Sequence, residues 1–153
     1  MGVRHDTVRL QQTFRQPVMR VFSAWTSIDA LSRWYVPGSE GWWSSIAEHE
    51  FRVGGRKRLS FGPSRSVTYE EDCRYEDIVP NERLVYSMTI SAETRRLTVS
   101  LVTVEFSAAG ESTTITLTDQ VAILDGADTA GERENGWKEV FQKLAGEVAG
   151  SGR

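Results

Sequence analysis

The sequence contains few of the residues on which metalloproteins and nucleophilic enzymes rely. It has one cysteine, Cys73, and two histidines, His5 and His49, among 153 residues. A single cysteine excludes an internal disulfide, and these three residues cannot supply the four ligands of a Cys/His zinc site. Cys73 has no histidine near it in sequence, so we interpret it as a buried structural thiol rather than a nucleophile. We therefore expect no metal and no cofactor.

Long apolar runs and an excess of positive charge are also missing. No stretch reaches the roughly 20 apolar residues of a transmembrane helix, and the N-terminus has no apolar segment typical of a signal peptide. The formal net charge is −3, whereas a nucleic-acid-binding domain needs a basic face. We therefore expect a cytoplasmic protein with no membrane span and no nucleic-acid partner.

The composition that remains is that of an ordinary globular protein. Hydrophobic residues make up 39% of the chain and charged residues 25%. A chain of this length can bury a core of its own. We interpret residues 1–153 as one domain whose core spans about 7–148.

The most regular apolar pattern lies in residues 131–148. Trp137, Phe141, Leu144 and Val148 follow one another at steps of four, three and four. This spacing places them on one face of an amphipathic helix. Just before them the helix contains a glycine at position 136, which costs about 1 kcal/mol relative to alanine. One reason to keep a glycine there is close approach of the helix to another backbone or to a ligand.

Upstream of this helix, apolar and polar residues alternate in a way typical of strands. Residues 7–14 predict a first strand. Two short helices then follow, the first beginning at Pro17 and the second capped by Ser27 or Asp29. Residues 42–124 predict six further strands separated by short turns.

This order of elements predicts an α+β fold. Consecutive strands joined by short turns pair antiparallel, and one polar face on each strand indicates a sheet covered on one side only. We expect a curved antiparallel sheet of six to seven strands, with two short helices after the first strand. The long C-terminal helix would lie over the concave face, with room beside it for a cavity.

Five short segments occur along this framework in a fixed order: Val21–Thr26, Leu31–Pro37, Glu50–Gly55, Pro80–Tyr86 and Gly136–Trp137. With the order of elements, they resemble the START-like (SRPBCC) superfamily, and within it the family of activator-of-heat-shock-protein-90-ATPase homologues of the single-domain bacterial type. The resemblance runs from about residue 9 to residue 148 and implies the helix-grip fold. It departs from the family at Glu50, where aspartate is usual.

The resemblance leaves three functions open. Single-domain bacterial relatives look like binders of apolar small molecules, so our leading hypothesis is non-enzymatic binding of a small hydrophobic or amphipathic molecule between the C-terminal helix and the sheet. A co-chaperone-like module with a chaperone as protein partner is one alternative. A START-like enzyme, such as a polyketide cyclase, is the other.

Large side chains that the alternation turns toward the interior are the candidate ligand-binding residues. They either fill an ordinary core or line a partly open pocket. The candidates are Trp34, His49, Phe51, Phe61, Tyr69, Tyr86, Met88, Trp137 and Phe141.

Two titratable residues decide how polar such a pocket would be. His49 either faces the cavity or lies at an edge near solvent. Glu71 is either a pocket carboxylate or, as we favour, part of an acidic run at residues 70–72 that a bulge displaces outward. If both faced inward they could form an acid–base pair. We name no catalytic residue and expect binding rather than catalysis.

Overall fold

The computed structural model describes residues 2–37 and 41–150, and this part of the chain contains seven strands and three helices. In chain order the elements are β1 (Val3–Phe14), α1 (Val18–Ser23), α2 (Ile28–Trp34), β2 (Trp43–His49), β3 (Arg56–Ser64), β4 (Val67–Val79), β5 (Arg83–Ala92), β6 (Arg95–Ala109), β7 (Ser112–Leu124) and α3 (Ala130–Gly150).

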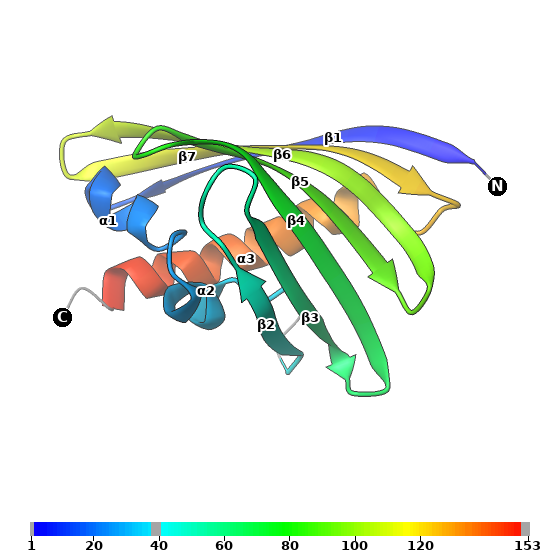
Figure 1. The fold of residues 1–153 in the computed structure, drawn as a ribbon. Coiled ribbons are helices and arrows are strands. Elements are labelled where there is room, and N and C mark those ends of the chain that lie inside the picture. The colour runs from blue at the N-terminus through cyan, green and yellow to red at the C-terminus, as the bar shows by residue number, and fades with distance from the viewer. Residues whose placement is uncertain (1, 38–40, 151–153) are drawn as a thin grey trace.

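All seven strands form one antiparallel sheet. Their spatial order is β1-β7-β6-β5-β4-β3-β2, so the strands from β2 to β7 are neighbours in sequence and β1 closes the far edge beside β7. Figure 1 shows the sheet curving over α3, which lies across its concave face. The predicted helix-grip architecture is confirmed.

The curvature of the sheet is concentrated in one half. The pairs β2–β3, β3–β4, β4–β5 and β5–β6 each contain a register shift, whereas β6–β7 and β1–β7 pair without interruption. A β-bulge bends its strand and increases the local twist. The strands β2 to β4 therefore curl down beside α3 in Figure 1.

The Thr129 side chain caps the start of the helix α3, which buries one face. The Glu132 amide donates to Thr129 Oγ1 at 3.1 Å, and Thr129 Oγ1 donates to Glu132 Oε1 at 3.2 Å. Trp137, Phe141 and Leu144 are all buried beneath the sheet, as the spacing predicts. The stripe holds the helix in place because each such side chain contributes roughly 1.5–3 kcal/mol on burial.

The two short helices, α1 and α2, cover one end of the space between the sheet and α3. Pro17 immediately precedes α1, and Ser27 Oγ caps α2 by accepting from the Ala30 amide at 3.2 Å. Of the two predicted caps, Ser27 is therefore the one used. The first helix packs against β6 and β7, and the second against α3 and β2.

Aromatic rings fill the interior at this closed end. Trp25 meets Trp34, Phe106 and Phe141 edge to face, with ring centroids 4.7, 6.1 and 6.4 Å apart. Trp34 Nε1 donates to the Ala24 carbonyl at 2.8 Å, which satisfies the indole. This end is a packed core, and the open space of the fold lies further along, toward the start of α3.

Candidate ligand-binding site

A cavity of about 160 Å³ lies between the first half of α3 and the strands β3 to β5. We call it the inner chamber. Most of its walls are apolar, as is usual for a small-molecule site. The residues that line it are Tyr35, Pro37, Phe61, Glu71, Met88, Ile90, Asp128, Arg133, Gly136, Trp137 and Val140.

A second space of about 390 Å³ continues from the inner chamber. We call it the outer chamber because its rim includes Glu132 and Glu139, which are exposed. The two chambers have five lining residues in common: Phe61, Ile90, Asp128, Arg133 and Gly136. We therefore treat them as two parts of one site.

Gly136 stands at the boundary of the two chambers. The sequence suggested that this glycine allows the helix to approach another backbone or a ligand. Outside its own helix, no atom lies within 4 Å of where a Cβ at Gly136 would be. The expectation that Gly136 lets the helix approach another backbone is therefore wrong. The missing side chain instead leaves space in both chambers.

Three aromatic rings stack along the outer chamber. The Trp42 ring lies nearly parallel to Tyr69, with centroids 5.9 Å apart and an interplanar angle of 8°, and it stacks on Phe61 at 6.3 Å. All three line the outer chamber, and Phe61 also lines the inner one. The stack offers a broad apolar wall at the point where the chambers meet.

Glu71 supplies a carboxylate to the inner chamber although it is only 3% exposed. The Tyr35 hydroxyl donates to Glu71 Oε2 at 2.7 Å, and the Cys73 thiol donates to the same oxygen at 3.3 Å. Lys57 Nζ lies 3.9 Å from it. Our expectation that a bulge displaces Glu71 outward is wrong, because the shift in β4 falls between Tyr75 and Asp77.

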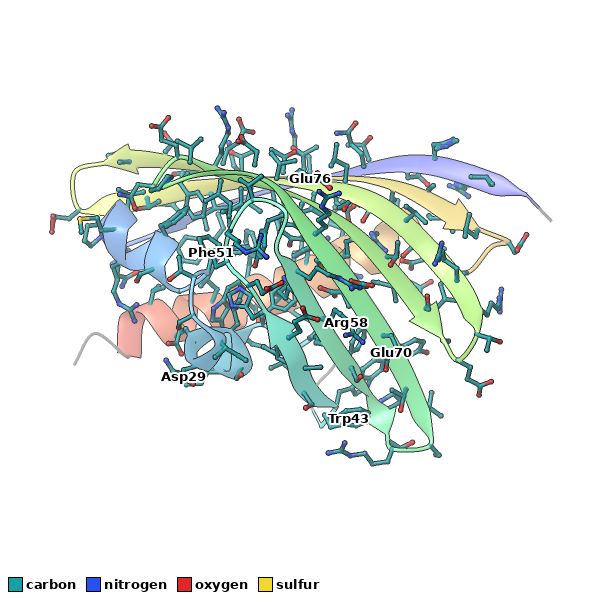
Figure 2. The ribbon with its side chains drawn as sticks, viewed as in Figure 1. Asp29, Trp43, Phe51, Arg58, Glu70 and Glu76 are labelled. Carbon is teal, nitrogen blue, oxygen red and sulfur yellow. The ribbon has the colours of Figure 1, made fainter. Side chains whose placement is uncertain are left out.

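Unlike Glu71, other acidic residues of β4 point to solvent. Glu70 and Glu76, which are labelled in Figure 2, are exposed on the outer face of the sheet. Glu70 accepts a hydrogen bond from Ser60 Oγ at 2.6 Å. Alternation along the strand thus sends the flanking carboxylates to solvent and Glu71 into the interior.

Lys57 balances the charge of Glu71 and is itself 1% exposed. Its ammonium lies over the Tyr35 ring, 3.6 Å from the centroid, and 4.7 Å from the centroid of Tyr86. Aromatic faces attract a cation, most strongly where water is excluded. A buried charge without such partners would be costly, so the ion pair and the rings together keep Lys57 inside.

The hydroxyl and thiol groups around this pair remain protonated. Burial, followed by the negative charge of Glu71, raises the pKa of Tyr35 well above its ordinary value, and the same two causes raise the pKa of Cys73. Burial likewise raises the pKa of Tyr86. Cys73 is 1% exposed, in agreement with a structural thiol.

A second buried ion pair joins α3 to the sheet. Arg133 Nε donates to Asp119 Oδ2 at 2.6 Å, and Trp137 Nε1 donates to the same oxygen at 2.9 Å. The other guanidinium nitrogens reach Thr98 and Asp128 from Nη1 and Ser100 from Nη2. Arg133 lines both chambers, but these hydrogen bonds account for four of its five N–H groups.

His49 does not line either chamber. Its ring is half-buried, and Nε2 lies 3.0 Å from the Tyr75 hydroxyl. Burial and the positive charge of Lys57 lower its pKa to about 4. Because His49 bonds to Tyr75, the acid–base pair with Glu71 that we considered is not formed.

The nine candidate ligand-binding residues divide into two groups. Phe61, Tyr69, Met88 and Trp137 line the chambers, and their role in binding stays a prediction. The other five pack in the interior or at the β2 edge, away from the chambers: Trp34, His49, Phe51, Tyr86 and Phe141. These five side chains point inward like the four that line the chambers. They lie under α1 and α2 or beside Lys57, however, where neighbouring side chains fill the space.

Sequence reasoning missed three charged residues of the interior, although local signals point to them. Arg133 precedes Trp137 by four residues and so belongs to the apolar stripe of α3. Lys57 shares parity with Leu59, and Asp119 alternates in step with Leu117. For each of the three, the position relative to a buried apolar residue therefore predicts that the side chain points into the interior.

Within the described ranges, no cluster of three or more His, Cys, Asp or Glu side chains could hold a metal ion. No helix in those ranges has the length and apolar character needed to cross a membrane.

Together, the curved antiparallel sheet, the long helix in its concave face and the cavity beside that helix define a START-like, helix-grip domain. The sequence model of one family within this class matches residues 15–149. The chain belongs to the family of Activator of Hsp90 ATPase homolog 1-like proteins.

Solved structures share this fold over nearly the whole chain. A protein from Rhizobium loti is 33% identical, with a TM-score of 0.86 over 96% of this chain and 99% of its own. An uncharacterized protein from Rhizobium leguminosarum is 29% identical, with a TM-score of 0.86 over 97% of each chain. A protein of the dynemicin biosynthetic locus, 19% identical with a TM-score of 0.71, shares the fold over 95% of this chain and 48% of its own. No curated protein matches the sequence.

Proposed function

We propose that the protein binds one small, largely apolar molecule in the two chambers and does not transform it. The observation that carries this proposal is the space beside Gly136. A helix that packed fully against the sheet would place a side chain there, yet a Cβ would meet no atom within 4 Å outside the helix itself.

The size of the inner chamber supports a ligand with a single ring or a short chain inside it. Its volume of about 160 Å³ is close to that of an engineered apolar cavity, about 150 Å³, that binds benzene. The outer chamber offers room for the rest of a larger molecule. Burial of apolar surface contributes about 25 cal/mol per Å², which is enough to hold such a ligand without many polar contacts.

The polar groups of the site favour binding over catalysis. Glu71 Oε2 already has contacts with Tyr35, Cys73 and Lys57. The opposing buried charges of Glu71 and Lys57 compensate each other. Catalysis also needs groups that stabilise charge developing on the substrate, and most of the other residues that line the inner chamber are apolar.

Filling the space at Gly136 tests the proposal. Gly136→Leu should lower the affinity for apolar ligands at least about tenfold, because the new side chain would occupy both chambers. The matched control is Gly146→Leu, since Gly146 is also in α3, is exposed, has no atom within 4 Å of its Cβ position, and lines no chamber. Both changes remove a helical glycine, which adds up to about 1 kcal/mol of stability.

The readouts are the melting temperature and tryptophan emission during titration with single-ring hydrocarbons such as propylbenzene. We expect the ligand to raise the melting temperature of the wild type and of the Gly146→Leu variant but not that of Gly136→Leu. Equal ligand responses in the two variants would contradict the chambers as the binding site.

A second candidate, an enzyme, is favoured by one observation: the Tyr35 hydroxyl and the Glu71 carboxylate, 2.7 Å apart, both line the inner chamber. Mass spectrometry of bound ligands after prolonged incubation separates the two functions. Recovery of unchanged ligand supports binding, and a product that Glu71→Gln fails to form supports the enzyme.

A further inference from the structure

The two oxygens of the buried Glu71 carboxylate are used unequally. Every hydrogen bond and ion pair that the described residues make with it, from Tyr35, Cys73 and Lys57, involves Oε2. No donor from this part of the chain reaches Oε1, and this oxygen is not among the fully buried side-chain atoms that lack a partner, so it faces accessible space. A carboxylate oxygen that faces a chamber and has no donor of its own is available to a hydrogen-bond donor on a ligand.

The inner chamber lies beside this carboxylate, and Glu71 lines it together with apolar side chains. Phe61, Met88 and Trp137 form much of the remaining wall. A ligand held there by its apolar body would therefore bring one end against the carboxylate. A donor on that end would satisfy Oε1.

The charge balance indicates what kind of donor fits. Lys57 lies 3.9 Å from Glu71 Oε2, so the two buried charges compensate each other. A neutral hydroxyl adds no charge to this site. An ammonium group would meet Lys57 as a like charge and would lose its own hydration, and a ligand carboxylate would meet Glu71 as a like charge.

We infer that the inner chamber selects neutral ligands in which a hydroxyl group is carried on a single ring, with the hydroxyl donating to Glu71 Oε1. This inference rests on the proposed function and names the ligand class for the same site. The ring lies between Phe61 and Trp137, and a substituent opposite the hydroxyl extends into the outer chamber.

A matched ligand series on the wild-type protein tests the inference by calorimetry at pH 7. The probes are 4-propylphenol, propylbenzene, 4-propylbenzoate and 4-propylbenzylamine, which differ in the group that would face Glu71. We expect the phenol to bind at least about tenfold more tightly than propylbenzene, as one hydrogen bond to a charged acceptor allows. The benzoate and the amine should bind more weakly than propylbenzene.

The outcomes separate the inference from the function on which it rests. Equal affinity of the phenol and propylbenzene, or tighter binding of either charged probe, overturns the hydroxyl preference and leaves a binding protein. Failure of all four probes to bind overturns both. Tighter binding of the phenol alone supports both.

Removing the polar group of the chamber assigns the preference to Glu71. In the triple variant Tyr35→Phe, Lys57→Met, Glu71→Leu, the ratio of phenol to propylbenzene affinities should fall to within about twofold. The matched control is Glu70→Gln, which changes the adjacent but exposed carboxylate and should keep the tenfold ratio. A preference that survives the triple variant would overturn the assignment, and if that variant does not fold, the ligand series still decides.

Discussion

One member of each buried ion pair, Arg133 or Glu71, lines the inner chamber, and the two pairs are built differently. Arg133 and Asp119 approach to 2.6 Å, and each of the other two guanidinium nitrogens has at least one acceptor. Lys57 and Glu71 are 3.9 Å apart, and aromatic rings hold the lysine. Each carboxylate has one oxygen without a donor from the described residues, but Asp119 Oδ1 is fully buried whereas Glu71 lines the inner chamber.

The difference separates a structural pair from one that is available to a ligand. The Arg133 pair connects α3 to β6 and β7, and its hydrogen bonds also hold Trp137 and the loop residue Asp128. The Lys57 pair connects two adjacent strands that already share a ladder, so the fold needs it less. A buried ion pair adds little net stability where its geometry is loose.

The largest effect is expected from breaking the Arg133 pair. Asp119→Ala should lower the free energy of unfolding by about 3–5 kcal/mol, because it leaves the buried guanidinium with only the more exposed Asp128 carboxylate as an ion-pair partner. Denaturant unfolding measures this loss. Glu134→Ala is the control, since it breaks only the exposed i,i+4 pair with Lys138 and should cost no more than about 0.5 kcal/mol. A loss below about 1 kcal/mol for Asp119→Ala would show that the pair does not fasten the helix.

Replacing each pair by apolar residues sharpens the comparison. Arg133→Met with Asp119→Leu should cost about 1–3 kcal/mol, because Trp137 Nε1 loses its acceptor. The triple variant that removes Lys57, Glu71 and the Tyr35 hydroxyl should change stability by no more than about 1 kcal/mol. The same unfolding titrations compare the two sets. The reverse order of losses would mean that the Lys57 pair is the structural one.

The smallest expected effect is the pH dependence of stability that arises from His49, whose pKa is affected by the charge of Lys57. Its pKa in the folded protein is lowered to about 4, first by burial and then by Lys57. The unfolded chain takes up this proton near pH 6.5, so the free energy of unfolding should fall as the pH is lowered from about 6.5 to about 4. Because the ring is half-exposed, solvent screening limits the loss to the order of 1 kcal/mol.

Nuclear magnetic resonance titration of His49 measures the shift directly. Lys57→Met should raise its pKa part of the way toward 6.5, whereas Arg133→Met should leave it near that of the wild type. A His49 that titrates near pH 6.5 in the wild type would contradict the effect. The variant His49→Gln assigns the resonance and should reduce the acid loss of stability.

Much of the architecture followed from local periodicity. The spacing of Trp137, Phe141 and Leu144 predicted the buried face of α3, and strand alternation predicted the curved sheet beneath which it lies. The inward orientation of Phe61 and Met88 followed in the same way. These features depend on the repeat of the backbone, 3.6 residues in a helix and two in a strand, which the sequence alone displays.

The site could be predicted only in part, because inward-facing residues are divided between core and cavity. Phe141 and Trp137 lie on one helical face, yet Phe141 packs against Trp25 while Trp137 borders the inner chamber. No local pattern separates them. What separates them is whether α1 and α2 fill the space opposite, and that depends on the packing of the whole chain.

By itself, the sequence determined the order of elements, the apolar face of each and the family. Only the tertiary structure decided that Glu71 lies inside and that His49 turns to Tyr75. A carboxylate stays buried when a partner compensates its charge, and here that partner, Lys57, comes from a neighbouring strand. The register of the sheet brings the two together, and periodicity within one strand carries no information about it.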